Sequence, residues 1–179
     1  MKSFVMLLTY LRILLGPVIF ILSVFFEMYL SALVIFIFCS ITDYFDGFLA
    51  RKFNQESSLG KLLDPIADKV LLTSSILAIL IITNDYFIGL MSMLILIREF
   101  WVSGLREFTA TNNIQTASDV TFLAKIKTTI QFIAIGAYFF SFSYGLSLGI
   151  FISSFILFLS LLISFKTGMT YTSNTFKLR

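Results

Sequence analysis

Apolar runs of about 20 residues recur along the whole chain, and they constrain its fold more than any other feature. A helix of this length crosses the hydrocarbon core of a bilayer. Such runs occur at roughly 5–26, 28–50, 61–82, 86–105, 124–144 and 146–165. With 58% hydrophobic residues, 13% charged residues and a mean hydropathy of +0.96, the chain does not suit a soluble surface. We expect an all-α integral membrane protein with about six transmembrane helices, forming one domain over residues 1–179.

The first run is expected to be a span and not a cleaved signal peptide. Thr9 and Arg12 interrupt it early, and it continues well beyond Pro17. The last run is rich in Phe, Leu and Ser, and we expect it to contribute little beyond bulk.

The basic residues predict the orientation in the membrane. If the spans alternate, connections 51–60 and 106–125 share a side with both termini. The opposite turns, near Glu27, Asp85 and Tyr144, carry no Lys or Arg. Positive residues favour the cytoplasmic side, so we expect a multi-pass protein of the cell inner membrane with both termini in the cytoplasm. Its basic face suits anionic membrane lipids, and nucleic acid is not needed to explain it.

Four carboxylates form two stripes on consecutive predicted helices. Asp43 and Asp46 are three residues apart, Asp64 and Asp68 are four apart, and each spacing places a pair on one helix face. Two antiparallel helices joined by a short cytoplasmic loop would bring the stripes together. Converging carboxylates need compensating charge, and a divalent metal ion supplies it. The chain has no His, so oxygen ligands and one or two Mg²⁺ or Mn²⁺ ions are expected.

Small residues accompany the acidic stripes. Gly47 and Ala50 follow Asp46 on its face, and Gly60 lies one turn before Asp64. A minimal side chain lets a bulky ligand such as a nucleotide approach the helix backbone. Metal ions at this position could bridge the diphosphate of such a ligand.

Two other interpretations of the carboxylates remain open. In the first, they only form ion pairs at the membrane interface with nearby basic residues, namely Arg51, Lys52, Lys61 and Lys69. Ion pairing alone would be the favoured explanation for one isolated Asp. It does not require four Asp residues on matching helix faces beside small residues. In the second, the chain is a divalent-cation transporter. Transport sites usually lie near the bilayer midplane, whereas these carboxylates lie near the predicted cytoplasmic boundary.

The same segment resembles the signature of the CDP-alcohol phosphatidyltransferase family, D-x-x-D-G-x-x-A-R, eight residues, then G-x-x-x-D-x-x-x-D. Every specified position is matched, by Asp43, Asp46, Gly47, Ala50, Arg51, Gly60, Asp64 and Asp68. A motif with eight specified residues and two helical spacings is far more specific than a lone glycine motif. The resemblance implies a six-helix membrane fold, usually a homodimer. It also implies that a CDP-linked lipid donates its phosphatidyl group to an alcohol while CMP leaves.

The resemblance also implies roles for individual residues. Asp43, Asp46, Asp64 and Asp68 become metal ligands, and Asp68 becomes in addition the catalytic general base for the acceptor hydroxyl. The nucleotide-binding residues become Asp46, Gly47, Ala50, Arg51 and Gly60. The Asn that often precedes the first span in this family is absent here.

The second half of the chain resembles the phosphatidylglycerophosphate synthase branch of the family, in Ile97 to Phe108 and in Lys125 to Gln131. The donor would then be CDP-diacylglycerol and the acceptor glycerol 3-phosphate. Arg98, Arg106, Lys125 and Lys127 would bind the acceptor phosphate. Arg98 lies inward from the end of its span, so Glu99 or the substrate must pair with it. Other acceptors remain open, as in a cardiolipin synthase or a phosphatidylinositol-phosphate synthase.

Overall fold

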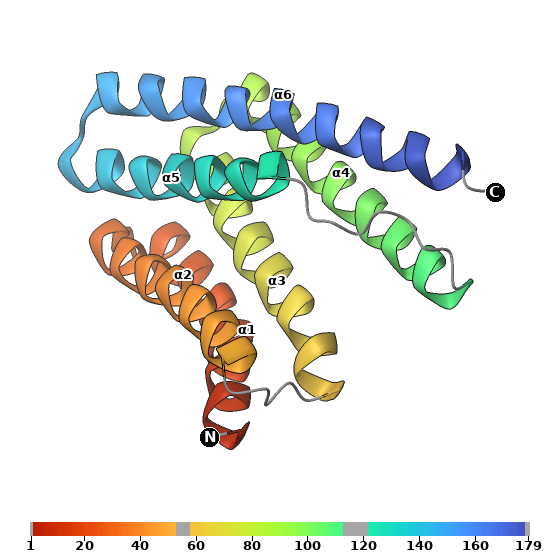
Figure 1. Cartoon of the computed structure of the whole chain (residues 1–179). Coiled ribbons are helices and arrows are strands. Elements are labelled where there is room, and N and C mark those ends of the chain that lie inside the picture. Colours follow the sequence, from red (N-terminus) through yellow and green to blue (C-terminus); the bar gives the residue numbers. More distant parts are fainter. Residues whose placement is uncertain (1, 53–57, 113–121, 178–179) are drawn as a thin grey trace. The chain divides into compact units, whose positions relative to one another are not determined.

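The structure is a computed structural model that describes residues 2–52, 58–112 and 122–177, apart from the side chains of residues 2–5, 44–52, 58, 61, 122–125 and 177. Its described ranges are helical throughout apart from short turns (Figure 1). The elements are α1 (Lys2–Val24), α2 (Tyr29–Lys52), α3 (Ser58–Thr83), α4 (Tyr86–Thr111), α5 (Phe122–Tyr144) and α6 (Ser147–Lys177). Each predicted run is one of these helices, although α4 and α6 continue beyond the predicted ends.

The helices have the length and composition of an all-α membrane protein. Four described segments are long and apolar enough to cross a bilayer: Met6–Val24, Leu62–Thr83, Tyr86–Thr111 and Ser147–Phe176. The apolar part of α2 is shorter, Tyr29–Asp43. The described part of α5 does not meet the same criterion, and it carries the buried polar residues Lys127 and Gln131. Many large apolar side chains point outward, as lipid contact requires; Leu14 and Phe151 are examples.

Sharp turns follow α1, α3 and α5, where the sequence predicts breaks. Glu27 and Asn84 adopt positive φ angles of 53° and 47°, and Gly145 has a φ of 62°. Such left-handed positions end a helix and favour Gly or Asn. Asp85 then caps α4, because its carboxylate accepts hydrogen bonds from the backbone N–H groups of Phe87 and Ile88 at 2.7 and 3.2 Å.

Contacts within the chain divide it into two compact units. Unit 1 comprises Met1–Asn84 and Ile135–Ile150, and unit 2 comprises Asp85–Ala134 and Phe151–Arg179. Helices α5 and α6 therefore each contribute to both units. The prediction of a single domain over residues 1–179 stays a prediction, and each unit is described below by itself.

Close packing of α1 on α3 organises unit 1. At Gly16, an added Cβ would lie 3.0 Å from Val70 Cγ1 and 3.2 Å from the Val70 carbonyl oxygen. Small residues allow helix backbones to approach closely in membranes. Gly16 lies one turn after Arg12, and Val70 lies two residues after Asp68, so this contact brings Arg12 to the depth of the acidic stripe on α3.

We expect Gly16→Ala to lower the stability of the protein by about 1–3 kcal/mol, because the new methyl group overpacks a backbone contact. The measurement is thermal unfolding in detergent. Gly136→Ala is the matched control, since its added Cβ would meet Leu33 Cδ1 at an ordinary 3.8 Å. Equal melting temperatures for the two variants would contradict close packing at Gly16.

Candidate active site

Three of the four predicted carboxylates meet in unit 1. Asp43 comes from α2, and Asp64 and Asp68 lie one turn apart on α3. All three form ion pairs with Arg12 of α1: Nη1 contacts Asp43 Oδ1, and it contacts Asp68 Oδ1 at 2.9 Å. Arg12 Nη2 lies 3.5 Å from Asp64 Oδ1. Asp43 from the first stripe and Asp64 and Asp68 from the second therefore approach a common point.

The first helix supplies two polar side chains to this cluster. Arg12 is only 1% exposed, whereas Asp43, Asp64 and Asp68 are 38%, 42% and 45% exposed. The hydroxyl of Thr9 donates a 2.8 Å hydrogen bond to Asp64 Oδ1. Thr9 and Arg12 are three residues apart, so they share one helix face.

Sequence reasoning did not place Thr9 or Arg12 in the site. The available signal was the charge itself, because an Arg inside an apolar span is costly unless it is paired. The sequence shows that Arg12 interrupts an apolar run, but it does not indicate which of several carboxylates pairs with it.

The donor set of the cluster fits a hard divalent cation. Its polar atoms are carboxylate oxygens, which are donors that suit Mg²⁺ and Mn²⁺. Within this group, three carboxylates and one guanidinium leave a net negative charge, which a divalent ion would compensate. Among the described side chains, no three Asp, Glu or Cys residues are arranged to bind an ion together, and the three aspartates meet at Arg12 instead. The side chain of Asp46, one turn after Asp43, lies outside the described residues.

The structure describes the remaining residues of the acidic motif only in part. Gly47, Ala50 and Arg51 lie in the last turns of α2, and their side chains are outside the described residues. Gly60 lies in the first turn of α3, one turn before Asp64. Pro65 lies inside α3, and the helix continues through it.

A second charged cluster lies in unit 2. The carboxylate of Glu99 accepts a 3.0 Å hydrogen bond from Arg98 Nη1 and forms an ion pair with Lys127 of α5. Arg98 and Lys127 are buried, and Glu99 is largely buried. Two cations therefore share one carboxylate, which leaves net positive charge in this group. Of the two partners expected for Arg98, Glu99 or the substrate, Glu99 is the one that pairs with it in the structure.

Helix α6 holds Arg98 in place. The Arg98 Nε donates to the Ser164 carbonyl oxygen at 2.9 Å, and Nη2 donates to the Thr167 hydroxyl at 2.9 Å. At Gly168, an added Cβ would lie 3.2 Å from Arg98 Nε. The expectation that the last span contributes little beyond bulk is therefore wrong. Its polar and small residues supply acceptors and space for the buried guanidinium of Arg98.

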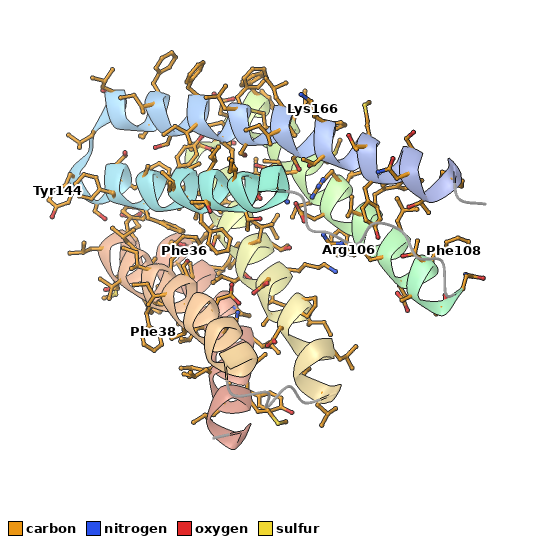
Figure 2. All side chains as sticks on the ribbon, viewed as in Figure 1. Phe36, Phe38, Arg106, Phe108, Tyr144 and Lys166 are labelled. Carbon is orange, nitrogen blue, oxygen red and sulfur yellow. The ribbon has the colours of Figure 1, made fainter. Side chains whose placement is uncertain are left out.

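Arg106, labelled in Figure 2, has a different environment from Arg98, although both residues belong to α4. It is exposed, and its guanidinium carbon lies 5.9 Å from the ring centre of Tyr171 on α6, within cation–π range. The side chain of Lys125, the fourth predicted phosphate ligand, is outside the described residues. The structure therefore joins Arg98 and Lys127 through Glu99 and places Arg106 against Tyr171.

Similarity to known proteins identifies the family of this chain. A sequence profile of the CDP-alcohol phosphatidyltransferases matches residues 5–166. The chain belongs to the CDP-alcohol phosphatidyltransferase family. The predicted resemblance is confirmed, and its range includes both charged clusters.

Several curated relatives of this chain share one name within the family. The CDP-diacylglycerol–glycerol-3-phosphate 3-phosphatidyltransferase of Wigglesworthia glossinidia brevipalpis is 37% identical over 133 residues, which cover 72% of this chain and 73% of the relative. The protein of the same name from Rickettsia typhi is 42% identical over 137 residues, or 75% of each chain. The one from Escherichia coli is 37% identical over 135 residues, or 72% of each chain.

Enzymes of the CDP-alcohol phosphatidyltransferase family generally depend on a divalent metal ion. The oxygen donors and the excess negative charge around Asp43, Asp64 and Asp68 fit that dependence. The assignment of ligands to individual aspartates remains a prediction.

The contact between Gly168 and Arg98 gives a testable expectation for this phosphatidyltransferase. We expect Gly168→Ala to lower the melting temperature, because the Arg98 Nε is fixed by the Ser164 carbonyl and cannot easily yield to a methyl group. Gly104→Ala on α4 is the control, since its added Cβ meets no described atom within 4 Å. Replacing that helical Gly should leave stability unchanged or raise it by up to about 1 kcal/mol. A stabilising Gly168→Ala would contradict the packing of α6 on Arg98.

Proposed function

We propose that this CDP-alcohol phosphatidyltransferase transfers the phosphatidyl group of CDP-diacylglycerol to glycerol 3-phosphate. The products are phosphatidylglycerophosphate and CMP, and the reaction belongs to phospholipid biosynthesis. The observation that carries the proposal is the convergence of Asp43, Asp64 and Asp68 from two helices, in a chain whose relatives bear the name of this activity.

Asp43, Asp46, Asp64 and Asp68 are the proposed ligands of one or two Mg²⁺ or Mn²⁺ ions. When bound, such an ion neutralises diphosphate charge and stabilises the departing CMP. Support comes from the shared approach of three of these carboxylates to one point and from their partial exposure. Asp46, Gly47, Ala50, Arg51 and Gly60 are proposed to line the nucleotide pocket, on the strength of the family motif alone.

Asp68 is the proposed general base. It accepts the proton of an acceptor hydroxyl, whose oxygen then attacks the lipid-bearing phosphorus of CDP-diacylglycerol. The bond between that phosphorus and the oxygen of the CMP phosphate breaks, and CMP leaves with the bonding electrons. Asp68 is nearly half exposed, which leaves it accessible to an acceptor from solvent.

The acceptor phosphate is proposed to bind at Arg98, Arg106, Lys125 and Lys127. Arg98 and Lys127 support this proposal because together they carry more positive charge than Glu99 neutralises. Charge-assisted hydrogen bonds to such a group favour a phosphate dianion over an uncharged alcohol. We further propose that the enzyme works as a homodimer in the inner membrane, with this site and both termini on the cytoplasmic side. The distribution of basic residues supports that orientation.

An acceptor panel tests the proposed function. Purified protein in detergent would receive CDP-diacylglycerol, Mg²⁺ or Mn²⁺ and one acceptor: glycerol 3-phosphate, phosphatidylglycerol, inositol phosphate or glycerol. CMP release is measured in each case and without acceptor. Release with glycerol 3-phosphate alone supports the proposal, whereas preferred use of phosphatidylglycerol or inositol phosphate would indicate a different acceptor within the family. Failure to release CMP with every acceptor would contradict the activity itself.

A further inference from the structure

Arg12 is a buried charge that the proposed reaction leaves without a role. Its guanidinium lies on the α1 side of the acidic cluster and contacts Asp43 of α2 as well as Asp64 and Asp68 of α3. Those contacts connect positions 31 to 56 residues apart. Arg12 therefore joins three helices of unit 1 at the point where the carboxylates meet.

In this arrangement the guanidinium of Arg12 is directed to the three aspartates and is almost fully buried. Its side chain is 1% exposed, while the three aspartates are each more than one third exposed. A ligand that arrives from solvent meets the exposed carboxylates before the guanidinium. The contacts of Arg12 therefore indicate that it acts on the reaction through the carboxylates.

The charges indicate what that action is. Three carboxylates brought together in a membrane protein repel one another, and positive charge must compensate them. In this structure Arg12 is such a compensating charge, and the Thr9 hydroxyl adds a hydrogen bond to Asp64. A divalent ion at the same carboxylates would provide compensation of its own and would at the same time be repelled by the guanidinium.

We propose that Arg12 is a built-in counter-cation of the metal site. It is a positioning residue that holds Asp43, Asp64 and Asp68 together before the divalent ion binds, and its fixed positive charge limits the affinity for that ion. The inference rests on the metal site of the proposed function. It adds a residue from outside the acidic motif and a property, the metal affinity, that this residue controls.

The proposal predicts that metal and Arg12 partly substitute for each other. Without metal, loss of the guanidinium leaves the carboxylates uncompensated, and the protein should unfold at a lower temperature. With metal bound, the ion supplies the positive charge, so most of that loss should disappear. A residue that only packs helices would instead cost the same stability in both conditions.

The experiment compares Arg12→Gln, Arg12→Lys and Lys166→Gln with the parent protein in detergent. Melting temperatures are measured in EDTA and in saturating Mn²⁺, and Mn²⁺ affinity is measured by electron paramagnetic resonance of the free ion. For Arg12→Gln we expect a lower melting temperature in EDTA, its recovery in Mn²⁺, and Mn²⁺ binding about tenfold tighter, since a nearby like charge is removed. Lys166→Gln removes one exposed positive charge from unit 2 and should resemble the parent in all three measurements.

Arg12→Lys separates charge from geometry and serves as the second variant if Arg12→Gln does not fold. It keeps the positive charge but cannot contact three carboxylates with a planar group. We expect a lower melting temperature in EDTA that Mn²⁺ restores, with Mn²⁺ affinity close to that of the parent.

Two results would overturn the role of Arg12 while leaving the metal site intact. One is an equal loss of melting temperature with and without Mn²⁺, together with unchanged affinity. The other is weaker Mn²⁺ binding in Arg12→Gln. If the parent binds no Mn²⁺, or if Asp64→Asn binds it as tightly as the parent, the proposed metal site fails and the role of Arg12 fails with it.

Discussion

We expect Asp43→Asn and Asp64→Asn each to lower CMP release by at least about a hundredfold while the protein remains folded in the membrane. Each change removes negative charge from the proposed metal site and conserves side-chain volume. The contacts explain why folding should survive. An Asn side-chain oxygen can still accept the hydrogen bond from Thr9 at position 64 or from Arg12 at position 43. The measurement is CMP release by purified protein in Mg²⁺ or Mn²⁺, with melting temperature as the test of folding.

Asp85→Asn is the matched control for these variants. It removes a carboxylate from the N-cap of α4, which lies outside the acidic cluster. Asn is about as good an N-cap residue as Asp, so stability and CMP release should stay near the parent values. Activity close to that of the parent in both Asp43→Asn and Asp64→Asn would contradict the metal-site assignment.

Arg106→Gln should reduce the use of glycerol 3-phosphate far more than the use of CDP-diacylglycerol. A hydrogen bond to a charged group contributes about 1.5–3 kcal/mol, so kcat/KM for the acceptor should fall about tenfold to a hundredfold. Arg106 is the clearest residue for this test because it is exposed and its ring contact with Tyr171 is weak. Kinetics are measured by varying each substrate while the other is held at saturation.

Lys127→Gln complements that test but should also affect stability. Lys127 is buried and paired with Glu99, so its loss leaves the carboxylate with Arg98. A lower melting temperature should therefore accompany weaker acceptor use. Lys166→Gln, which removes an exposed charge from α6, is the control for both variants. If the Arg106 and Lys127 variants lose donor and acceptor use in parallel, or if the parent uses glycerol as well as glycerol 3-phosphate, the acceptor assignment is wrong.

The helices and their breaks could be predicted because the signals are local. An apolar run of about 20 residues indicates a helix that is surrounded by lipid. The turns at Glu27, Asn84 and Gly145 depend on a few neighbouring residues. The face shared by Asp64 and Asp68 follows from the helical repeat alone. Helices α4 and α6 extend beyond the predicted runs, because both continue through polar residues that hydropathy does not assign to a span.

Contacts between residues far apart in the sequence could not be predicted from such local signals. Arg12 pairs with Asp68, 56 residues away, and Arg98 donates to the Ser164 carbonyl, 66 residues away. A membrane helix is apolar around most of its surface, so its periodicity does not indicate which face meets which neighbour.

The sequence by itself determined that this is an all-α membrane protein with two acidic helix faces, because hydropathy and the 3.6-residue repeat are properties of single helices. Only the tertiary structure decided that Arg12 and Thr9 pair with the acidic faces and that Ser164, Thr167 and Gly168 surround Arg98. The physical reason is that a buried charge requires a partner of opposite sign or a suitable dipole, but its sequence position does not specify which one. The close approach of the α3 backbone at Gly16 and of the Arg98 side chain at Gly168 depends on packing between helices, which sets the side chains that come within hydrogen-bonding distance.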